Sequence, residues 1–252
     1  MKKILITGGT SGVGLAIAKD LVQLGHQVIL VGRNAGRGKA VKESLGEFAT
    51  FFSADITIQE DLQRLDEFVS DHFGRLDVLI HFAGIYPKDA EENRRFNLKG
   101  HYDVTVRLKK YLAKGRVLMV TGNPVAVQHA PVLRSQKTGL LRAAWMLSRK
   151  TFLMLYLAEQ LKKEKMTVNA FFPGDVKSRL MPYTSRLTNE QVPVGAYLAL
   201  SENVADISGT FFDEDGRVVL LKKGKYHFAK AKQILEQTLD LHAFKRAQKK
   251  QA

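Results

Sequence analysis

The chain has 252 residues, of which 45% are hydrophobic, and a formal net charge of +14. This length and apolar content fit one α/β domain better than two. Cysteine is absent, which excludes disulfides and thiolate metal sites, and no apolar run reaches the 18 residues of a transmembrane helix. We expect a cytoplasmic domain without a metal, outside the membrane, because the N-terminus enters a strand directly and lacks a signal-peptide core.

The first fifteen residues are the most informative segment. A short apolar run, Ile4–Ile6, breaks into glycines at Gly8, Gly9, Gly12 and Gly14, and a helical pattern follows. Strand, tight turn and helix in this order let backbone N–H groups and the positive end of a helix approach a pyrophosphate. The segment therefore predicts dinucleotide binding.

Apolar runs alternate with helical patterns along the rest of the chain. Strands are expected at Lys3–Ile6, Gln27–Val31, Thr50–Ser53, Val78–Phe82, Arg116–Val120, Thr167–Phe172 and Gly209–Phe212. Helices are expected at Val13–Leu24, Gly36–Leu45, Ile58–Phe73, Ala90–Ala113, Thr138–Lys163 and Glu190–Leu200. Most of these strands lack strict alternation, which is typical of strands buried on both faces. The pattern predicts one doubly wound parallel α/β sheet of about seven strands, with helices on both faces.

The C-terminal segment carries half of the excess positive charge. Residues 222–252 hold nine Lys or Arg and two acids, and a last helix is expected at Phe228–Ala247. Its apolar side would pack on the domain and leave its lysines in solvent. We expect a main domain over residues 1–222 and a basic helical extension over residues 223–252. A basic surface favours anionic partners, but no nucleic-acid-binding motif stands out, so nucleic-acid binding is not expected.

The end of the second strand suggests which dinucleotide is bound. The residue that reads the adenosine ribose is expected about twenty positions past the glycine turn, where an acid would bind the 2′-hydroxyl. Here Gly32 and Arg33 occupy that place, followed by Asn34, with Arg37 nearby. A guanidinium matches a phosphate in charge and geometry, so NADP is favoured over NAD.

Asp55 and Ile56 follow the third strand. At a strand's carboxyl end the Asp55 carboxylate could accept a hydrogen bond from the adenine amino group. Alternatively, Asp55 or Thr57 is a helix N-cap. The two roles are compatible if side chain and backbone divide them.

Several dispersed motifs resemble those of the short-chain dehydrogenase/reductase family over roughly residues 1–220. They are Thr7-Gly8-x-x-x-Gly12-x-Gly14, His81-Phe82-Ala83-Gly84 with both family asparagines replaced, Asn97, the segment Val168–Gly174 ending in Pro173-Gly174, and Gly209–Phe212. Lys225-Tyr226 weakly resembles the retinol-dehydrogenase-like branch. The resemblance implies a Rossmann fold, an NADP-binding oxidoreductase acting on a carbonyl or hydroxyl substrate, and a homo-oligomer formed through the two long helices. The cofactor site would comprise Gly8, Thr10, Ser11, Gly12, Val13, Gly14, Arg33, Asn34, Arg37, Asp55, Ile56, Ala83, Gly84, Pro173, Gly174 and Val176.

The catalytic residues that the resemblance implies are incomplete. Family members use a Ser, a Tyr and a Lys four residues after the Tyr, and an Asn that matches Asn97. Asn123 lies near the Ser position and could donate to a carbonyl. Counting back from Pro173-Gly174 puts Ala143 and Leu147 at the Tyr and Lys positions. A two-residue slip puts Trp145 and Arg149 there and keeps a cation for the ribose.

Other residues are weaker candidates for a proton donor. Tyr86, His81, His129 and Tyr183 each carry a suitable group, but packing or surface roles explain them more simply. The one Tyr-x-x-x-Lys segment, Tyr226–Lys230, follows the last strand and is interpreted as a chance match. An NADP-dependent oxidoreductase with an atypical proton donor and a catalytically inactive NADP-binding sensor both remain open. The substrate cannot be read from the loop Asp175–Gln191.

Overall fold

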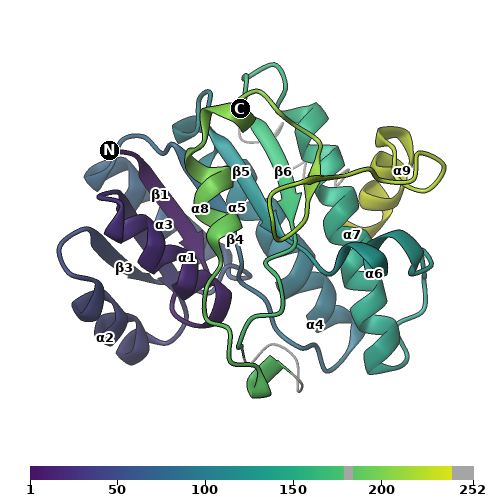
Figure 1. Ribbon diagram of the computed structural model, residues 1–252, viewed down its shortest axis with the longest axis horizontal. Helices are drawn as coiled ribbons and strands as arrows, with labels where there is room; N and C mark the ends of the chain where they lie inside the picture. Colours follow the sequence, from purple (N-terminus) through teal and green to yellow (C-terminus); the bar gives the residue numbers. More distant parts are fainter. Residues whose placement is uncertain (179–183, 240–252) are drawn as a thin grey trace.

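The computed structural model describes residues 1–178 and 184–239. In these residues one sheet runs through the molecule in the strand order β3-β2-β1-β4-β5-β6-β7-β8 (Figure 1). The strands are β1 (Lys3–Thr7), β2 (Gln27–Gly32), β3 (Ala49–Ser53), β4 (Val78–His81), β5 (Arg116–Val120), β6 (Thr167–Phe171), β7 (Phe211–Phe212) and β8 (Val218–Val219). All pairings are parallel except that of β7 with β8.

The doubly wound α/β fold is confirmed, with one strand more than expected in the described chain. β8 is a two-residue antiparallel strand, and its sequence, Val218-Val219, is too short to give a periodic signal. The strand order reverses between β1, which continues to β2, and β4, which continues to β5. A ligand of such a sheet binds at the carboxyl ends of the strands at this reversal point.

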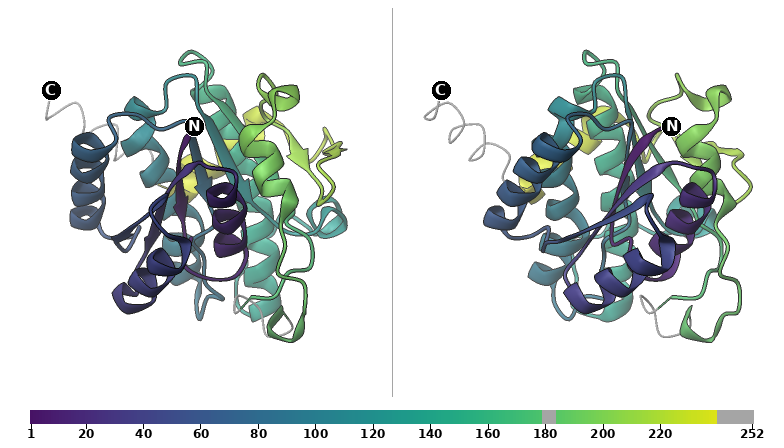
Figure 2. Two further views of the ribbon diagram at one scale, coloured as in Figure 1. Left: turned by 60° about the vertical axis from the view of Figure 1, so that its left-hand side comes forward. Right: turned by 90° about the vertical axis from the view of Figure 1, so that its left-hand side faces the viewer.

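Helices cover both faces of the sheet (Figure 2). Their bounds are α1 (Gly12–Gln23), α2 (Ala35–Leu45), α3 (Gln59–His72), α4 (Ala90–Arg94), α5 (Gly100–Leu108), α6 (Pro124–His129), α7 (Gly139–Gln160), α8 (Pro193–Leu200) and α9 (Phe228–Leu239). A π-helical turn, Arg95–Lys99, joins α4 to α5, and short 3₁₀ turns lie at Lys109–Tyr111, Thr184–Arg186 and Glu202–Val204. The expected helix Ala90–Ala113 is therefore divided, and α8 begins later than expected because Pro193 starts it.

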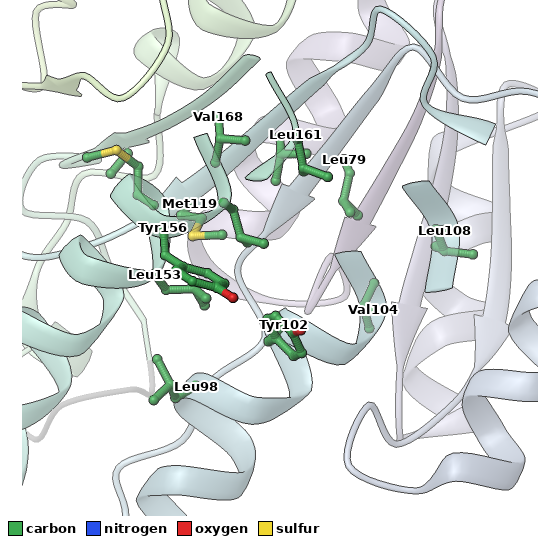
Figure 3. Close-up of a cluster of buried hydrophobic side chains, with 14 of the residues drawn as sticks. Leu79, Leu98, Tyr102, Val104, Leu108, Met119, Leu153, Tyr156, Leu161 and Val168 are labelled. Carbon is green, nitrogen blue, oxygen red and sulfur yellow. The ribbon is translucent and has the colours of Figure 1, made fainter. Parts of the chain in front are cut away.

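Alternate strand residues feed two separate cores, as strands buried on both faces require. One core joins Ile4, Ile6, Val28 and Leu30 to α1 and α8. In the other, drawn in Figure 3, Leu79, Met119 and Val168 of neighbouring strands lie against Tyr102 of α5 and against Leu153 and Tyr156 of α7. The two cores fix the strand ends that form the site.

Helix α9 packs along α7 on the side away from the sheet (Figure 1). Its Ala231, Leu235 and Leu239 are buried, while its lysines face outward, as the sequence predicts for the part of the helix that is described. The remainder of the expected helix, residues 240–247, lies outside the described residues. The division into domains at residue 222 stays a prediction.

Candidate active site

The glycine turn after β1 brings three backbone segments into contact. Gly8 has φ +75°, and a Cβ there would lie 2.7 Å from the backbone nitrogen of Ala83. A Cβ on Gly14 would lie 2.5 Å from the carbonyl oxygen of Gly8. Both positions therefore require glycine. Thr7 Oγ1 accepts a hydrogen bond from the N–H of Ala83 at 3.3 Å, which ties the turn to the end of β4.

A first cavity of about 210 Å³ lies between this turn and the ends of β2 and β3. Most of the expected dinucleotide residues line it, together with residues that the sequence reasoning did not select, among them Val31, Ala54, Ile85 and Phe96. The expected ones are Gly8, Thr10, Ser11, Arg33, Asn34, Arg37, Asp55, Ile56, Ala83 and Gly84. Gly12 lines a neighbouring groove with Thr10, Ser11, Lys19 and Arg37. We call the first cavity the adenosine-side cavity.

Arg33 is the main cationic group of the adenosine-side cavity. Its guanidinium lies over the Phe96 ring, 5.0 Å from the ring centroid, and its Nη1 is 3.8 Å from Asp55 Oδ2. Over half of the side chain is exposed. Asn34 caps α2 by accepting from the N–H of Arg37 at 2.8 Å, so it holds the backbone beside Arg33. Arg33 is thus oriented but remains open to an anion.

Asp55 does not cap α3, so the N-cap alternative is wrong. The helix begins at Gln59, and its N-cap is Ile58, without a capping side chain. Asp55 Oδ1 accepts instead from the backbone N–H and the hydroxyl of Thr57, at 2.9 and 2.8 Å. These two hydrogen bonds form a local turn at Asp55 and Thr57, before the N-cap of the helix. Asp55 Oδ2 is left facing Arg33 and the cavity.

A second cavity, of about 230 Å³, lies under α7 at the ends of β4, β5 and β6. Its lining is mostly apolar and includes Val13, Phe82, Val120, Ala126, Met146, Phe172, Pro173 and Val176. Gly84, Asn97, Asn123 and Gly174 also line it. Of the lining residues that the structure describes, Lys150 and Asp175 are charged and none is a tyrosine. We call it the α7 cavity.

The α7 cavity decides between the two proposed alignments of α7. Ala143, Met146, Leu147 and Lys150 line it, which are positions i, i+3, i+4 and i+7 of one helix face. Ala143 and Leu147 therefore stand where the first alignment puts them. Leu147 packs on Gly122, directly after β5. Because Leu147 is apolar, the first alignment has no cation at the position of the family's lysine.

The second alignment would use Trp145 and Arg149, and neither residue lines the α7 cavity. The Arg149 guanidinium lies over the Trp145 ring at 5.2 Å, Nη1 donates to Ser148 Oγ, and the residue is absent from the lining of the α7 cavity. Burial lowers the pKa of Arg149 to about 10. Position 149 is three places from Met146 and two from Leu147, so it projects to the side of the helix facing Tyr226. The Arg149 guanidinium thus packs on Trp145, outside the described lining of this cavity.

Lys150 is the functional candidate that the sequence reasoning missed. It is 7% exposed, and its Nζ lies 3.4 Å from the carbonyl oxygen of Val120, the last residue of β5. Burial lowers the pKa of its ammonium to about 8. The signal that would have found it is the helix face itself, because Lys150 is one turn beyond Leu147 and seven residues after Ala143.

Asn97 and Asn123 both line the α7 cavity, but each side chain also forms hydrogen bonds with backbone groups. Asn97 lies in the π turn, accepts from the N–H of Ile85 and donates to the Ile85 carbonyl, each at 3.0 Å. It fixes the segment after Gly84, which makes it a positioning residue. Asn123 Oδ1 caps α6 by accepting from the N–H of Val125 at 2.8 Å. Its amide nitrogen is the group left to face a ligand.

The other candidate proton donors lie elsewhere. His81 is fully buried at the end of β4, outside the lining of the α7 cavity, and burial lowers its pKa to about 3. His129 is exposed at the end of α6, and Tyr86 is 43% exposed beside Gly139. Tyr183 lies outside the described residues. Tyr226 donates to the carbonyl of Val127 at 2.8 Å, so the Tyr226–Lys230 segment does not face this cavity.

Known proteins resemble this chain both in sequence and in structure. The profile described as short chain dehydrogenase matches residues 2–134, more than half of the chain. The chain belongs to the short-chain dehydrogenase family. The human 15-hydroxyprostaglandin dehydrogenase [NAD(+)] is 28% identical over 82% of this chain and 78% of its own length. An uncharacterized oxidoreductase of Staphylococcus epidermidis is 40% identical, but the match spans 33% of this chain and only 36% of the relative's length.

Solved structures confirm the fold of this family member. A short chain dehydrogenase of Shigella flexneri, complexed with NADP, superposes with a TM-score of 0.72 at 21% identity over 85% of this chain and 97% of its own. A 3-ketoacyl-(acyl-carrier-protein) reductase of Brucella melitensis, complexed with NADH, gives 0.69 at 24% identity over 84% and 96%. At this identity the likeness supports the Rossmann-like sheet. The described helices include none that is long and apolar enough to cross a membrane.

Proposed function

We propose that this chain is an NADP-dependent oxidoreductase that acts on a carbonyl or hydroxyl compound. The observation that carries the proposal is Arg33, held over Phe96 in a cavity where the glycine turn leaves no room for a Cβ. The similar proteins do not agree on the dinucleotide. The human dehydrogenase is named for NAD(+), and the two solved structures contain NADP and NADH, respectively. The choice of NADP therefore depends on the residues of this chain.

The residues present fit a nicotinamide dinucleotide. Gly8, Thr10, Ser11, Gly12 and Gly14 would hold its pyrophosphate at the N-terminus of α1. Arg33, Asn34 and Arg37 would bind the 2′-phosphate, and Asp55 and Ile56 the adenine. Ala83, Gly84, Val13, Pro173, Gly174 and Val176 would lie along the ribose and nicotinamide. When bound, the dinucleotide supplies or accepts a hydride.

The charge balance at Arg33 favours a phosphate over a ribose hydroxyl. Asp55 is the nearest carboxylate, 3.8 Å away, and its Oδ1 is already engaged by Thr57. A phosphate would offer Arg33 a bidentate, doubly charged partner. Arg37 lines the same cavity and adds a second cation.

Calorimetric titration with NADPH and NADH tests this proposal. We expect NADPH to bind at least tenfold more tightly, and Arg33→Gln to weaken NADPH binding by about 10–100-fold while leaving NADH binding within threefold. Arg75→Gln is the matched control, because Arg75 is an exposed arginine paired to Asp77 outside both cavities. Equal affinity of the wild type for the two dinucleotides would contradict the NADP choice.

One observation favours a second candidate, a catalytically inactive NADP-binding sensor. The described lining of the α7 cavity holds Ala143 and Leu147 on the face of α7 that would carry the family's Tyr and Lys. Turnover separates the two candidates: NADPH oxidation is followed with a panel of apolar aldehydes and ketones. Tight NADPH binding without reduction of any panel member supports the sensor.

We also propose that the chain forms a homo-oligomer. The family resemblance supports an interface on the helices that correspond to α5 and α7. In this chain α9 packs on α7, with Tyr156 and Phe228 rings stacked 6.3 Å apart. Any interface built on α7 therefore includes α9. Sedimentation of the full chain, compared with a variant carrying charged residues on the exposed side of α9, tests this arrangement.

A further inference from the structure

Lys150 is a buried cation without a carboxylate partner in the described parts of the chain. No ion pair of residues 1–178 and 184–239 includes it, and within these residues the hydrogen-bond contact of its Nζ is the 3.4 Å approach to the Val120 carbonyl. A buried unpaired charge is costly and is retained where it serves a function. Its position on the lining of the α7 cavity points to a ligand.

Two neutral imidazoles lie near Lys150 and cannot replace it as a proton donor. The rings of His81 and His101 stack with centroids 4.9 Å apart, and both are fully buried. His101 Nε2 contacts the Ala83 carbonyl, which only accepts, so that nitrogen carries the hydrogen. Thr105 donates to the His101 carbonyl at 2.9 Å, so its Oγ1 accepts from His81 Nε2. Each ring therefore keeps Nδ1 as an unpaired acceptor.

The electrostatic surroundings of Lys150 follow from these contacts. His81 on β4 and His101 on α5 face it, burial lowers the pKa of both, and the Lys150 charge lowers them further. Asp175, which is exposed on the loop after β6, is the other charged residue of the described lining. The titratable groups to be distinguished in this cavity are therefore Lys150 and Asp175.

We propose that Lys150 is the catalytic proton donor of this oxidoreductase, in place of the family's tyrosine, and that its substrate is an aldehyde or ketone with apolar substituents. The inference rests on the proposed function. The apolar lining by Phe82, Met146 and Phe172 favours such substituents.

In the proposed reaction, the Lys150 ammonium gives one proton to the oxygen of the substrate carbonyl. The substrate carbon gains the hydride from the reduced nicotinamide dinucleotide, which is the reductant and leaves oxidised. The carbonyl π bond breaks, and its electron pair moves to the oxygen. An N–H bond of the Lys150 ammonium then breaks, and its proton joins that oxygen to complete the alcohol. The neutral amine of Lys150 takes up a proton from solvent. Burial places the pKa of this ammonium at about 8, which suits a general acid near neutral pH.

Competitive labelling of lysines with acetic anhydride, read by mass spectrometry between pH 6 and 11, tests Lys150 without measuring activity. We expect Lys150 to be labelled with a midpoint near pH 8, and the labelling of the exposed Lys163 serves as the internal reference in the same samples. NADP should protect Lys150 at least tenfold, whereas 2′-phospho-ADP-ribose, which lacks nicotinamide, should protect it less than twofold. An ordinary midpoint at Lys150, or equal protection by both ligands, overturns the proposal.

Kinetics of two substitutions complete the test. Lys150→Met removes the proton, and Lys150→Arg keeps a charge that does not ionise in the working range. Both should lower kcat at least 100-fold while the Kd for NADPH changes less than threefold. Wild-type kcat/KM for reduction should fall as the pH rises above about 8, and any residual Lys150→Met activity should lack this limb. Lys163→Met is the matched control and should behave as the wild type.

The outcomes separate this inference from the proposed function. Failure to bind NADPH overturns the proposed function itself. NADPH binding without reduction of any carbonyl supports the inactive sensor, and it overturns the oxidoreductase activity together with the proton-donor role. Reduction that persists in Lys150→Met, or a pH limb that is lost in Asp175→Asn and kept in Lys150→Met, overturns Lys150 as the donor.

Discussion

The adenosine-side cavity is lined by glycines, two arginines and a carboxylate, whereas the α7 cavity is lined mainly by apolar side chains around one buried lysine. The two cavities share Gly84 at the end of β4. Recognition of phosphate needs backbone N–H groups and exposed cations, which tolerate solvent. Proton transfer benefits from a dry surrounding that shifts a pKa toward the working pH. The same sheet edge provides both environments.

The difference also shows where this chain departs from its family. The family profile matches residues 2–134, and this stretch contains the glycine turn, Arg33 and Asp55. Helix α7 begins after it, at Gly139. On the face of α7 that lines the cavity stand Ala143 and Leu147, with Lys150 one turn later. The match to the family profile therefore includes the glycine turn and Arg33, whereas α7 lies beyond it.

The first prediction concerns the glycine turn that borders the adenosine-side cavity. Gly14→Ala would place a Cβ 2.5 Å from the Gly8 carbonyl oxygen and 3.0 Å from Phe82 Cδ1, which forces the turn apart. We expect NADPH affinity to fall at least ~100-fold, which is about 2.7 kcal/mol. Calorimetry measures the loss, and circular dichroism checks the fold. Gly224→Ala, where a Cβ meets nothing within 4 Å, is the matched control. A Kd within threefold of the wild type would show that the turn does not hold the ligand.

The sequence was sufficient to predict this cavity because its determinants are local. Gly8, Gly12 and Gly14 stand within seven residues, and their requirement for close backbone contacts shows directly in residue type. Arg33 follows β2 at once. Phe96 was missed, because it reaches the cavity from the π turn before α5, and a π turn has no periodic pattern that distinguishes it from a helix.

A second prediction concerns the histidines beneath the two cavities. His81 is neutral in the folded chain with a pKa of about 3, against about 6.5 when unfolded. Its contribution to stability is therefore full above pH 6.5 and is lost as the pH falls toward 3. His101 acts in the same direction. We expect the free energy of unfolding to fall by about 1.4 kcal/mol per pH unit for each imidazole, or about 2 kcal/mol for His81 between pH 6.5 and 5.

Urea denaturation at a series of pH values measures this loss. His81→Asn, which restores a family asparagine, should have a shallower acid limb than the wild type. His129→Asn removes an exposed histidine and should leave the slope unchanged. Parallel pH curves for the wild type and His81→Asn would mean that His81 does not resist protonation.

The third prediction isolates the energetic cost of the buried cation. The folded pKa of Lys150 is about 8, below the unfolded value of about 10.4, so the folded chain disfavours the ammonium. The destabilisation caused by this ammonium is absent above pH 10.4, grows as the pH falls from 10.4 to about 8, and is fully present below pH 8. We expect Lys150→Met to raise the free energy of unfolding by about 1–2 kcal/mol at pH 7, with the gain shrinking toward pH 10.4.

Denaturation at pH 7 and pH 10 checks the sign. Lys163→Met should change stability by less than about 0.5 kcal/mol, because its side chain is exposed. A Lys150→Met variant that is less stable than the wild type at pH 7 would make Lys150 a structural residue rather than one kept at a cost to the fold.

The α7 cavity could be predicted only in part. The count back from Pro173-Gly174 selects Ala143 and Leu147, and both residues line the α7 cavity. A search for a Tyr-x-x-x-Lys pattern then favoured Arg149 as the cation, although a residue two places from Leu147 projects to another side of a helix. Which side faces the sheet is decided by packing of Phe152 and Leu153 in the core, which a local spacing rule does not contain.

The last prediction concerns Tyr226, which lies behind helix α6 at one wall of the α7 cavity. Tyr226 donates to the Val127 carbonyl at 2.8 Å, and Lys225 Nζ also contacts this carbonyl, so together they hold the last turn of α6. Burial raises the pKa of Tyr226 to about 12.

Tyr226→Phe should lower the free energy of unfolding by about 1 kcal/mol. Because α6 carries Asn123 and Ala126 at the cavity wall, KM should rise severalfold while kcat and its pH limb are kept. Tyr86→Phe, at an exposed tyrosine, is the control for stability. Loss of the pH limb in Tyr226→Phe would instead make this tyrosine part of the proton path and remove Lys150 from it.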